Sequence, residues 1–334
     1  MQELTTLAFN DMVKLGEVMW IDGYKSVSNS MRDSGFVKVM NIPANSGDSR
    51  EFGEIDSNEY ISVKGESEQA KRGKAQIGYK KIMYAQRIAE NFGISHEMRT
   101  RGKYPQIVAG LTALGRKPAV TIDLDLSHRI TFGTATSYTD RDGSTVSTTC
   151  GDGLALFSTA HTLTQSSTTY RNRLANNPQL SKGALEAMQT MIVENSFNNL
   201  GEKMAATFDI LWITDNPVLI HAAEELTKSS ASVEGTNSGV INVYQGKLRT
   251  VILPRVATTA AGAIDTTKRN YWGLASSIHS SFYLGIWEEP RFIPASSATE
   301  DLQTDDWEFR TRAGYGIVTV SGRGITLSSG DGTA

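Results

Sequence analysis

The sequence has little cysteine and no long apolar run. Its single cysteine, Cys150, excludes an internal disulfide framework and any multi-cysteine zinc site, and it fits a reducing compartment. No stretch of about 18 consecutive apolar residues occurs, so we expect no transmembrane helix. The first residues lack a basic start followed by an apolar core, so we also expect no secretory signal.

An excess of charge of one sign is also missing. The 33 Lys and Arg residues nearly balance the 36 Asp and Glu residues, for a net charge of −3. The chain as a whole is therefore not expected to attract nucleic acid electrostatically. The apolar fraction of 39% and the charged fraction of 21% are those of an ordinary soluble protein. With 334 residues, the chain is expected to form two or more folding units.

Recognisable catalytic and metal-binding arrangements are scarce. Ser158 and His161 could form a nucleophile and its base, but the strained Gly-x-Ser-x-Gly turn is absent, which favours a histidine that packs or hydrogen-bonds. Asp125 and His128 share one face of a predicted helix, close to Asp123. No third ligand follows at a suitable spacing, which favours a solvated helix face. The sequence therefore predicts no catalytic, cofactor-binding or metal-binding residue.

Two short glycine-containing motifs give similarly weak signals. Asp140-Arg-Asp-Gly-Ser144 resembles the start of a calcium loop, but Gly151 stands at the twelfth position, where the bidentate glutamate belongs. We expect a turn there, within a polar loop over residues 134–150. Gly322-Arg-Gly324 lacks the third glycine and the following helix of a dinucleotide site, so we expect a hairpin turn.

Hydrophobic periodicity predicts four helical regions. Residues 3–21 form an amphipathic helix, which either packs on its own domain or acts as an arm that needs the surface of a partner. Residues 97–132 form one long helix kinked at Pro118, or two helices end to end. Two further helices are predicted over residues 181–200 and, starting at Pro217, over residues 217–228.

Alternating and buried apolar runs predict the strands. Residues 36–43 form a strand, and the polar tract 44–78, with a short strand at 59–63, leads to returning strand character at 77–88. This pattern is typical of an extended hairpin or a disordered loop. Further strands are predicted over 208–214, 247–254, 270–275 and 282–287, with a closing hairpin of 307–312 and 317–320. Predicted helices and strands alternate in the middle of the chain, and only strands are predicted toward its end, which indicates an α+β fold.

Charge is unevenly distributed along the chain. Residues 64–81 are mostly basic and residues 288–308 are mostly acidic. These stretches are either two solvated surfaces or a basic loop tip that docks on an acidic strand region of a neighbouring subunit. The candidate interface residues are the basic loop cluster, Lys71, Arg72 and Lys74, and the acidic cluster, Asp305, Asp306 and Glu308.

The order of several short motifs resembles that of the major capsid proteins of tailed bacteriophages, nearest to the Mu-like major head subunit family. Gly151 to His161 resembles the motif of a small turn, apolar residues, Phe-Ser, and a histidine three residues after the serine. Asp209 to Pro217 resembles a strand that leads into a helix started by proline. Segments that resemble the closing strands are Tyr271–Ala275, Phe282–Trp287, Phe309–Arg312 and Tyr315–Val318.

The resemblance implies the Hong Kong 97-type shell fold, which is α+β, and a division of the chain into named parts. The expected parts are an N-terminal arm (1–44), an extended loop (45–83), a peripheral domain (84–180) that includes a spine helix at about 97–132, an axial domain (181–275), and C-terminal strands that rejoin the peripheral domain (276–334).

The resemblance also implies a structural protein rather than an enzyme. Such a protein self-assembles into hexamers and pentamers of an icosahedral shell, encloses packaged double-stranded DNA by non-specific contact, and is found in the virion after assembly in the bacterial host cytoplasm. Separate scaffolding, portal and decoration proteins are possible partners, and no membrane or cofactor is expected. The alternatives are an encapsulin-like compartment with the same fold and a hydrolase that uses Ser158 and His161.

Overall fold

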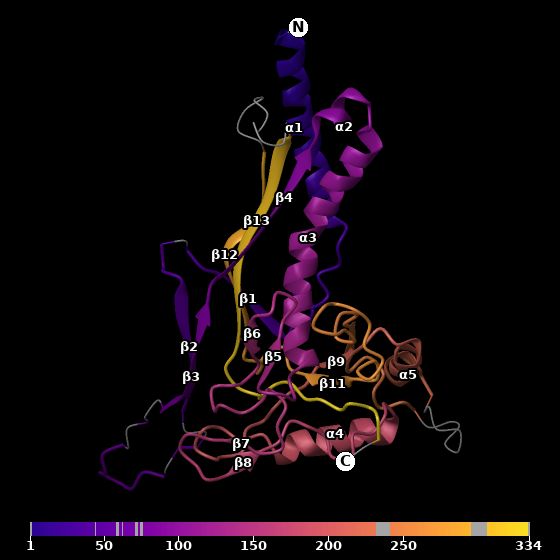
Figure 1. The fold of residues 1–334 in the computed structure, drawn as a ribbon. Coiled ribbons are helices and arrows are strands. Elements are labelled where there is room, and N and C mark those ends of the chain that lie inside the picture. Colours follow the sequence, from indigo (N-terminus) through magenta and orange to yellow (C-terminus); the bar gives the residue numbers. More distant parts are fainter. Residues whose placement is uncertain are drawn as a thin grey trace.

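The computed structural model describes residues 2–43, 45–57, 60–61, 63–70, 73, 76–231, 241–294 and 306–332, with the backbone alone for residues 2–8. Helices and strands are mixed along this chain, so the predicted α+β class is confirmed. Figure 1 shows a tall, narrow part that contains α1, α3, β4, β12 and β13 and stands on a broader base with α4, α5 and the shorter strands. None of the described helices is both long and apolar enough to cross a membrane.

The long helical region consists of two helices, α2 (His96–Thr100) and α3 (Tyr104–Thr131). Ser95 caps α2, since its side chain accepts a hydrogen bond from the backbone N–H of Met98. The interruption lies around Gly102, whose φ of +65° suits glycine. Pro118 lies inside α3, which continues through it. The sequence placed the interruption at the proline, whereas the structure places it at the glycine.

Helix α1 (Gln2–Lys25) packs along α3 of the same chain. Two glycines permit the close approach of the two backbones. A Cβ atom on Gly23 would lie 2.2 Å from the carbonyl oxygen of Thr112, and one on Gly115 would lie 2.1 Å from that of Trp20. The apolar core here includes Phe9, Met12, Trp20, Ile94, Ile107, Leu111, Leu114, Trp307 and Phe309. Over its described side chains, α1 is therefore a helix packed on its own chain.

The main sheet has four strands in the order β1 (Val37–Asn41), β12 (Phe282–Ile293), β13 (Trp307–Thr319) and β4 (Gln86–Ile94). The predicted closing hairpin is wrong, because β13 runs unbroken for 13 residues. Its glycines permit close packing rather than a turn. A Cβ atom on Gly316 would lie 2.5 Å from the carbonyl oxygen of Tyr84.

A second sheet in the base has the order β10 (Arg249–Ile252), β9 (Ile210–Ile213) and β11 (Trp272–Ala275). Helices α4 (Lys182–Glu194) and α5 (Pro217–Lys228) share an apolar core with this sheet. Ser181 caps α4 and Asn216 caps α5 through their side chains. Both predicted helix starts are confirmed, whereas α4 ends earlier than residue 200.

The remaining strands form three hairpins. An extended hairpin is present, formed by β2 (Ser49–Asp56) and β3 (Gln76–Tyr84). Its first strand lies inside the predicted polar tract, whereas the strand predicted at 36–43 is β1, which pairs with β12 in the main sheet. Of the short strand predicted at 59–63, residues 60, 61 and 63 lie in no strand, and residues 59 and 62 lie outside the described residues. The predicted polar loop at 134–150 contains a small hairpin, β5 (Ser137–Thr139) and β6 (Thr145–Ser147). Strands β7 (His161–Thr162) and β8 (Thr169–Tyr170) form the third hairpin.

Candidate assembly surfaces

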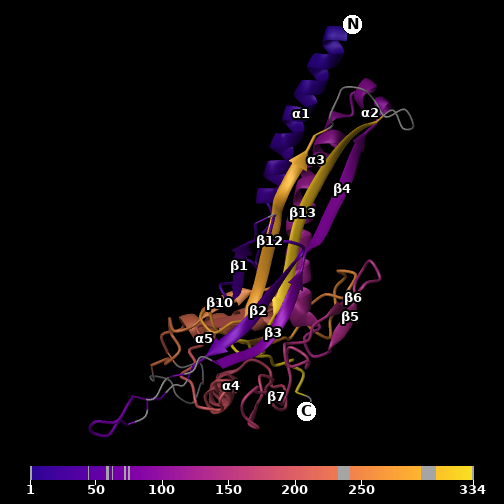
Figure 2. The same ribbon diagram turned by 90° about the vertical axis from the view of Figure 1, so that its left-hand side faces the viewer.

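The β2–β3 hairpin projects sideways from the body of the molecule, as Figures 1 and 2 show from two directions. Its outer part carries large apolar side chains in contact with solvent. The exposed fractions are 73% for Ile55, 99% for Ile61, 98% for Val63 and 59% for Ile77. Apolar side chains gathered on a projecting element are typical of a surface that binds another protein.

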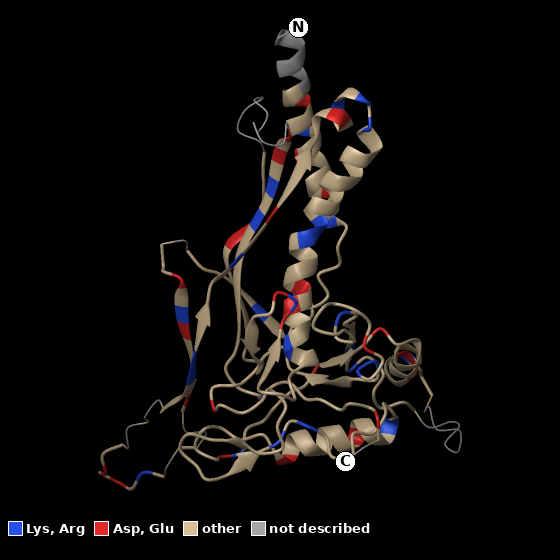
Figure 3. Ribbon diagram, viewed as in Figure 1, with Lys and Arg blue, Asp and Glu red and all other residues tan. Residues whose placement is uncertain are grey.

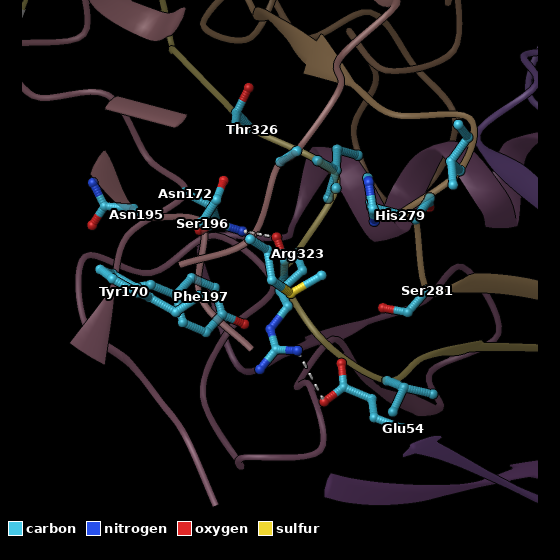
Figure 4. A pocket seen from close by; sticks show the side chains of 18 of the residues that line it. Glu54, Tyr170, Asn172, Asn195, Ser196, Phe197, His279, Ser281, Arg323 and Thr326 are labelled. Atoms are coloured by element: carbon cyan, nitrogen blue, oxygen red, sulfur yellow. Dashed lines mark hydrogen bonds and ion pairs between the residues drawn. The ribbon is translucent and has the colours of Figure 1, made fainter. Parts of the chain in front are cut away.

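A buried polar joint fixes the loop end of the hairpin strands, next to the exposed Ile55, to the body (Figure 4). The Arg323 guanidinium lies 3.0 Å from Asp56 Oδ2 and 3.9 Å from Glu54 Oε2. It also donates a hydrogen bond of 2.8 Å to Asn199 Oδ1. The backbone N–H of Asn199 donates to Asp56 Oδ2 at 2.8 Å. The joint therefore links the hairpin to two distant segments of the chain.

The charge on Arg323 is favoured within this joint. Burial alone would lower the pKa of its guanidinium, but the negative charges of Glu54 and Asp56, together with Tyr170, raise the pKa above its ordinary value. A cavity of about 350 Å³ adjoins the joint and is lined partly by Asn172. Its lining mixes polar and apolar side chains from the hairpin, β8 and the chain after β13.

The basic loop cluster (Lys71, Arg72 and Lys74) lies outside the described residues. Nearer the body, two further lysines of the basic stretch have partners within the chain. Lys80 forms an ion pair of 2.7 Å with Glu51 across the hairpin. Lys81 donates a hydrogen bond to the carbonyl oxygen of Thr149. These two lysines therefore contribute less to an attraction between subunits than the sequence suggested.

The acidic cluster lies where β13 begins. Asp305 is outside the described residues, and Glu308 accepts a hydrogen bond of 3.0 Å from the side chain of Asn91. Asp306 directly precedes β13. At the start of the acidic stretch, Glu288 forms an ion pair of 2.8 Å with Arg312. The acidic stretch is thus partly neutralised within the chain.

The start of β13 and the outer part of the hairpin lie at opposite ends of the molecule (Figures 1 and 3). Both positively and negatively charged residues occur along the described part of the hairpin (Figure 3). The basic loop cluster and Asp305 lie outside the described residues, so the contact between the two clusters of neighbouring subunits stays a prediction.

Ser158 and His161 do not form a catalytic pair. His161 is fully buried, with Nδ1 2.7 Å from Asp152 Oδ2 and Nε2 3.2 Å from the carbonyl oxygen of Leu156. The hydroxyl of Ser158 instead accepts a hydrogen bond from the backbone N–H of Ala160. The prediction of a packing, hydrogen-bonding histidine is confirmed.

The predicted solvated face of α3 is wrong. Asp123, Asp125 and His128 are all buried. Asp123 accepts a hydrogen bond of 2.8 Å from the backbone N–H of Met31, and Asp125 accepts one of 3.1 Å from Arg141. Met31 lies far from α3 in sequence, and Arg141 lies in the loop that follows the helix. Helical spacing alone therefore could not show that this end of the helix is enclosed.

The two glycine-containing motifs have different outcomes. Residues 140–144 form the predicted turn, which joins β5 to β6, and the side chain of Asp142 accepts a hydrogen bond from the backbone N–H of Ser144. Residues 322–324 do not form the predicted hairpin. They form a turn after β13 that leads to an isolated bridge between Ile325 and Ala275.

Residues 79–328 match the phage capsid protein family, which is more than half of the 334 residues. The chain belongs to the phage capsid protein family. The match includes α3, three of the four strands of the main sheet (β4, β12 and β13), the second sheet and the buried His161 region. A capsid protein is a structural component, and the function predicted from the motif order is confirmed at this level.

Several solved structures resemble the chain over most of its length. A virus-like particle from Pyrococcus furiosus has 13% identity and a TM-score of 0.46, with 96% of this chain and 98% of that chain covered. The mature capsid of bacteriophage PhiM1 has 11% identity and a TM-score of 0.48, with 88% and 85% covered. The capsid of the Myoviridae phage XM1 has 10% identity and a TM-score of 0.47, with 88% and 89% covered. No curated protein matches the sequence.

The capsid protein contains, in order, an N-terminal helix, an extended hairpin, a spine helix, a middle region of mixed structure and a long closing strand. This is the order expected from the resemblance to the Hong Kong 97-type fold. The Mu-like assignment, the domain boundaries and the two charged clusters remain predictions.

Proposed function

We propose that this capsid protein is the major head subunit of a tailed phage, nearest to the Mu-like group. Copies of the chain would close into hexamers and pentamers of an icosahedral shell around packaged double-stranded DNA. The observation that supports this proposal most strongly is the projecting β2–β3 hairpin, whose outer apolar side chains meet no core of their own chain.

Contact with a neighbouring subunit would remove apolar side chains of the hairpin from water. Full burial of one aliphatic side chain stabilises a contact by about 1.5–3 kcal/mol. Ile55, Ile61, Val63 and Ile77 are mostly exposed, so a partner surface would bury several such groups at once. A closed shell gives every hairpin an equivalent neighbour, and weak contacts repeated around a ring add up to a stable assembly.

The joint at the loop end of the hairpin strands suits the same role. The joint at Arg323 connects the hairpin to Asn199 and to the chain after β13. A hairpin held at a defined angle presents its apolar outer part in the same way on every copy. Such preorganisation reduces the entropy lost when subunits associate.

The remaining partners follow from the shell proposal. The net charge of −3 favours a lining that confines DNA without holding it tightly, by contacts to phosphates rather than to base edges. Scaffolding, portal and decoration proteins would be separate chains. The mature location would be the virion, after assembly in the cytoplasm of the bacterial host, with no catalytic step assigned to the chain.

The hairpin can be tested by a double substitution, Ile61→Ser with Val63→Ser. Both side chains are almost fully exposed, so the subunit should keep its circular dichroism spectrum. Particle formation, measured by sedimentation and electron microscopy, should fall sharply. Val218→Ser is a matched control, because Val218 is also exposed, at 71%, but lies on α5. Normal particles from the double variant would contradict the proposed role of the hairpin.

A further inference from the structure

The fold brings together two sequence motifs that were each too weak to indicate a metal site alone. Asp125 and His128 lie one helical turn apart on α3. Asp140 begins the turn between β5 and β6. One potential ligand atom from each of these three residues lies within 4.8 Å of the other two. The third ligand that is missing from the spacing of the helix is thus supplied by a different element.

Buried atoms without partners mark the same place. Nδ1 of His128 and Oδ1 of Asp140 are buried and have no hydrogen-bond partner among the described residues. His128 itself is 0% exposed, and its Nε2 lies 3.3 Å from the hydroxyl of Thr258. Buried polar atoms in folded proteins are almost always satisfied by protein, by water or by an ion. Two such atoms therefore belong to the same three-residue group, which also satisfies the distance requirement for a shared ligand.

We propose that Asp125, His128 and Asp140 bind a divalent transition-metal ion of the zinc class. One imidazole nitrogen and two carboxylate oxygens form a donor set that suits zinc and its first-row neighbours. Calcium and magnesium prefer sites made of oxygen alone. The bound ion would fasten the β5–β6 hairpin to the C-terminal end of the spine helix.

The surroundings of the three residues fit such a site. The Asp125 carboxylate accepts hydrogen bonds from Tyr315 and from Arg141. Outer groups that hold a ligating carboxylate in this way orient it toward a metal.

The test uses the full chain, free of metal, titrated with Co²⁺ and separately with Zn²⁺. The unmodified protein should bind one equivalent of Co²⁺ with a visible absorption band, and Zn²⁺ should displace it and raise the midpoint of thermal unfolding. Asp140→Asn should weaken Co²⁺ binding at least tenfold. Asp142→Asn should bind like the unmodified protein, because Asp142 lies in the same turn but is exposed and outside the group.

Three results would overturn the proposal. They are the absence of saturable Co²⁺ binding by the unmodified protein, equal binding by the Asp140→Asn and Asp142→Asn variants, and displacement of Co²⁺ by an equimolar amount of Ca²⁺. Circular dichroism of each variant shows that the fold is kept before binding is compared. If Asp140→Asn does not fold, the titrations of the unmodified protein and of Asp142→Asn still decide whether a zinc-class ion binds.

Discussion

Removal of the Arg323 guanidinium should detach the loop end of the hairpin strands from the body. In Arg323→Ala, the ion pair with Asp56 and the hydrogen bond to Asn199 are lost together. The carboxylates of Glu54 and Asp56 are only 12% and 18% exposed, so they would remain partly buried without a cation. Breaking a buried ion pair by removing one partner costs about 3–5 kcal/mol. Since Asn199 still donates to Asp56, we expect a loss near the lower end, about 3 kcal/mol.

The loss can be measured by urea unfolding of the unassembled subunit. Lys80→Ala is the matched control, because its ion pair with Glu51 lies on the same hairpin with both side chains 52% exposed, and such pairs contribute about 0–1 kcal/mol. The loss of unfolding free energy in Arg323→Lys should lie between those of Arg323→Ala and Lys80→Ala, since lysine keeps the charge but cannot donate the several directed hydrogen bonds of a guanidinium. Hydrogen exchange in β2 and β3 should quicken in Arg323→Ala. An alanine variant no less stable than the Lys80 control would refute the reasoning.

Three further predictions concern the loop, the charged clusters and the buried histidine. Deletion of residues 65–76 should leave the circular dichroism spectrum unchanged but reduce particle counts, because this polar segment contributes little to a core; normal particles would show that the loop makes no essential contact. Reversing the charges of the basic loop cluster or of the acidic cluster should block assembly, and added salt should partly relieve each of these defects. Reversing both clusters in one chain should restore assembly in part. If the combined variant folds but does not assemble, the two clusters do not contact each other. His161→Ala should lower the free energy of unfolding by about 1–3 kcal/mol, since it leaves Asp152 without its buried partner. Ser158→Ala should lower it less. Equal effects of the two substitutions on thermal unfolding would contradict a stabilising contact between His161 and Asp152.

The pH dependence of stability offers a check on the same buried pair. Burial raises the pKa of Asp152, but the hydrogen bond and charge of His161 outweigh it and hold the pKa below its ordinary value. A carboxyl with a lowered folded-state pKa stabilises the fold above its unfolded pKa, and this contribution disappears as the pH falls through the folded value. Urea unfolding of Asp152→Asn should therefore show a shallower loss of stability below about pH 4 than the unmodified protein. Parallel curves would contradict this account.

Local signals in the sequence were sufficient for several elements. The cap at Ser181 and the start of α5 at Pro217 were predicted correctly because capping and proline geometry depend on a few neighbouring residues. The buried strands β9 and β11 were also predicted from their apolar runs. The returning strand β3 of the extended hairpin was predicted, whereas its first strand β2 lies within the tract that the sequence marks as polar.

Glycine caused the main error in the sheet. Gly314 and Gly316 resemble turn residues between two short strands, but they permit close packing inside the single long strand β13. The role of such a glycine depends on which backbone or side chain approaches it. That information comes from strand pairing between distant segments, here β12 and β4 on either side of β13.

The proposed metal site likewise depends on contacts that the spacing of residues in the sequence does not reveal. Asp125 and His128 are visible as a pair in the sequence, but Asp140 joins them only because the β5–β6 hairpin folds back on α3. The burial of Asp123 likewise depends on partners from distant segments, including the backbone at Met31. Spacing within one helix carries no information on either contact. The basic loop cluster and the acidic cluster remain predictions, since only Asp306 and Glu308 among them lie in the described part of the chain.

The most direct test of the shell proposal is electron microscopy of the purified chain under assembly conditions, with sedimentation velocity run in parallel. We predict closed particles or rings with fivefold and sixfold groupings of subunits, and a fast-sedimenting species whose amount rises with protein concentration. A well-folded protein that remains a monomer at high concentration, with the apolar outer part of the hairpin protected from proteolysis against its own body, would contradict the proposal.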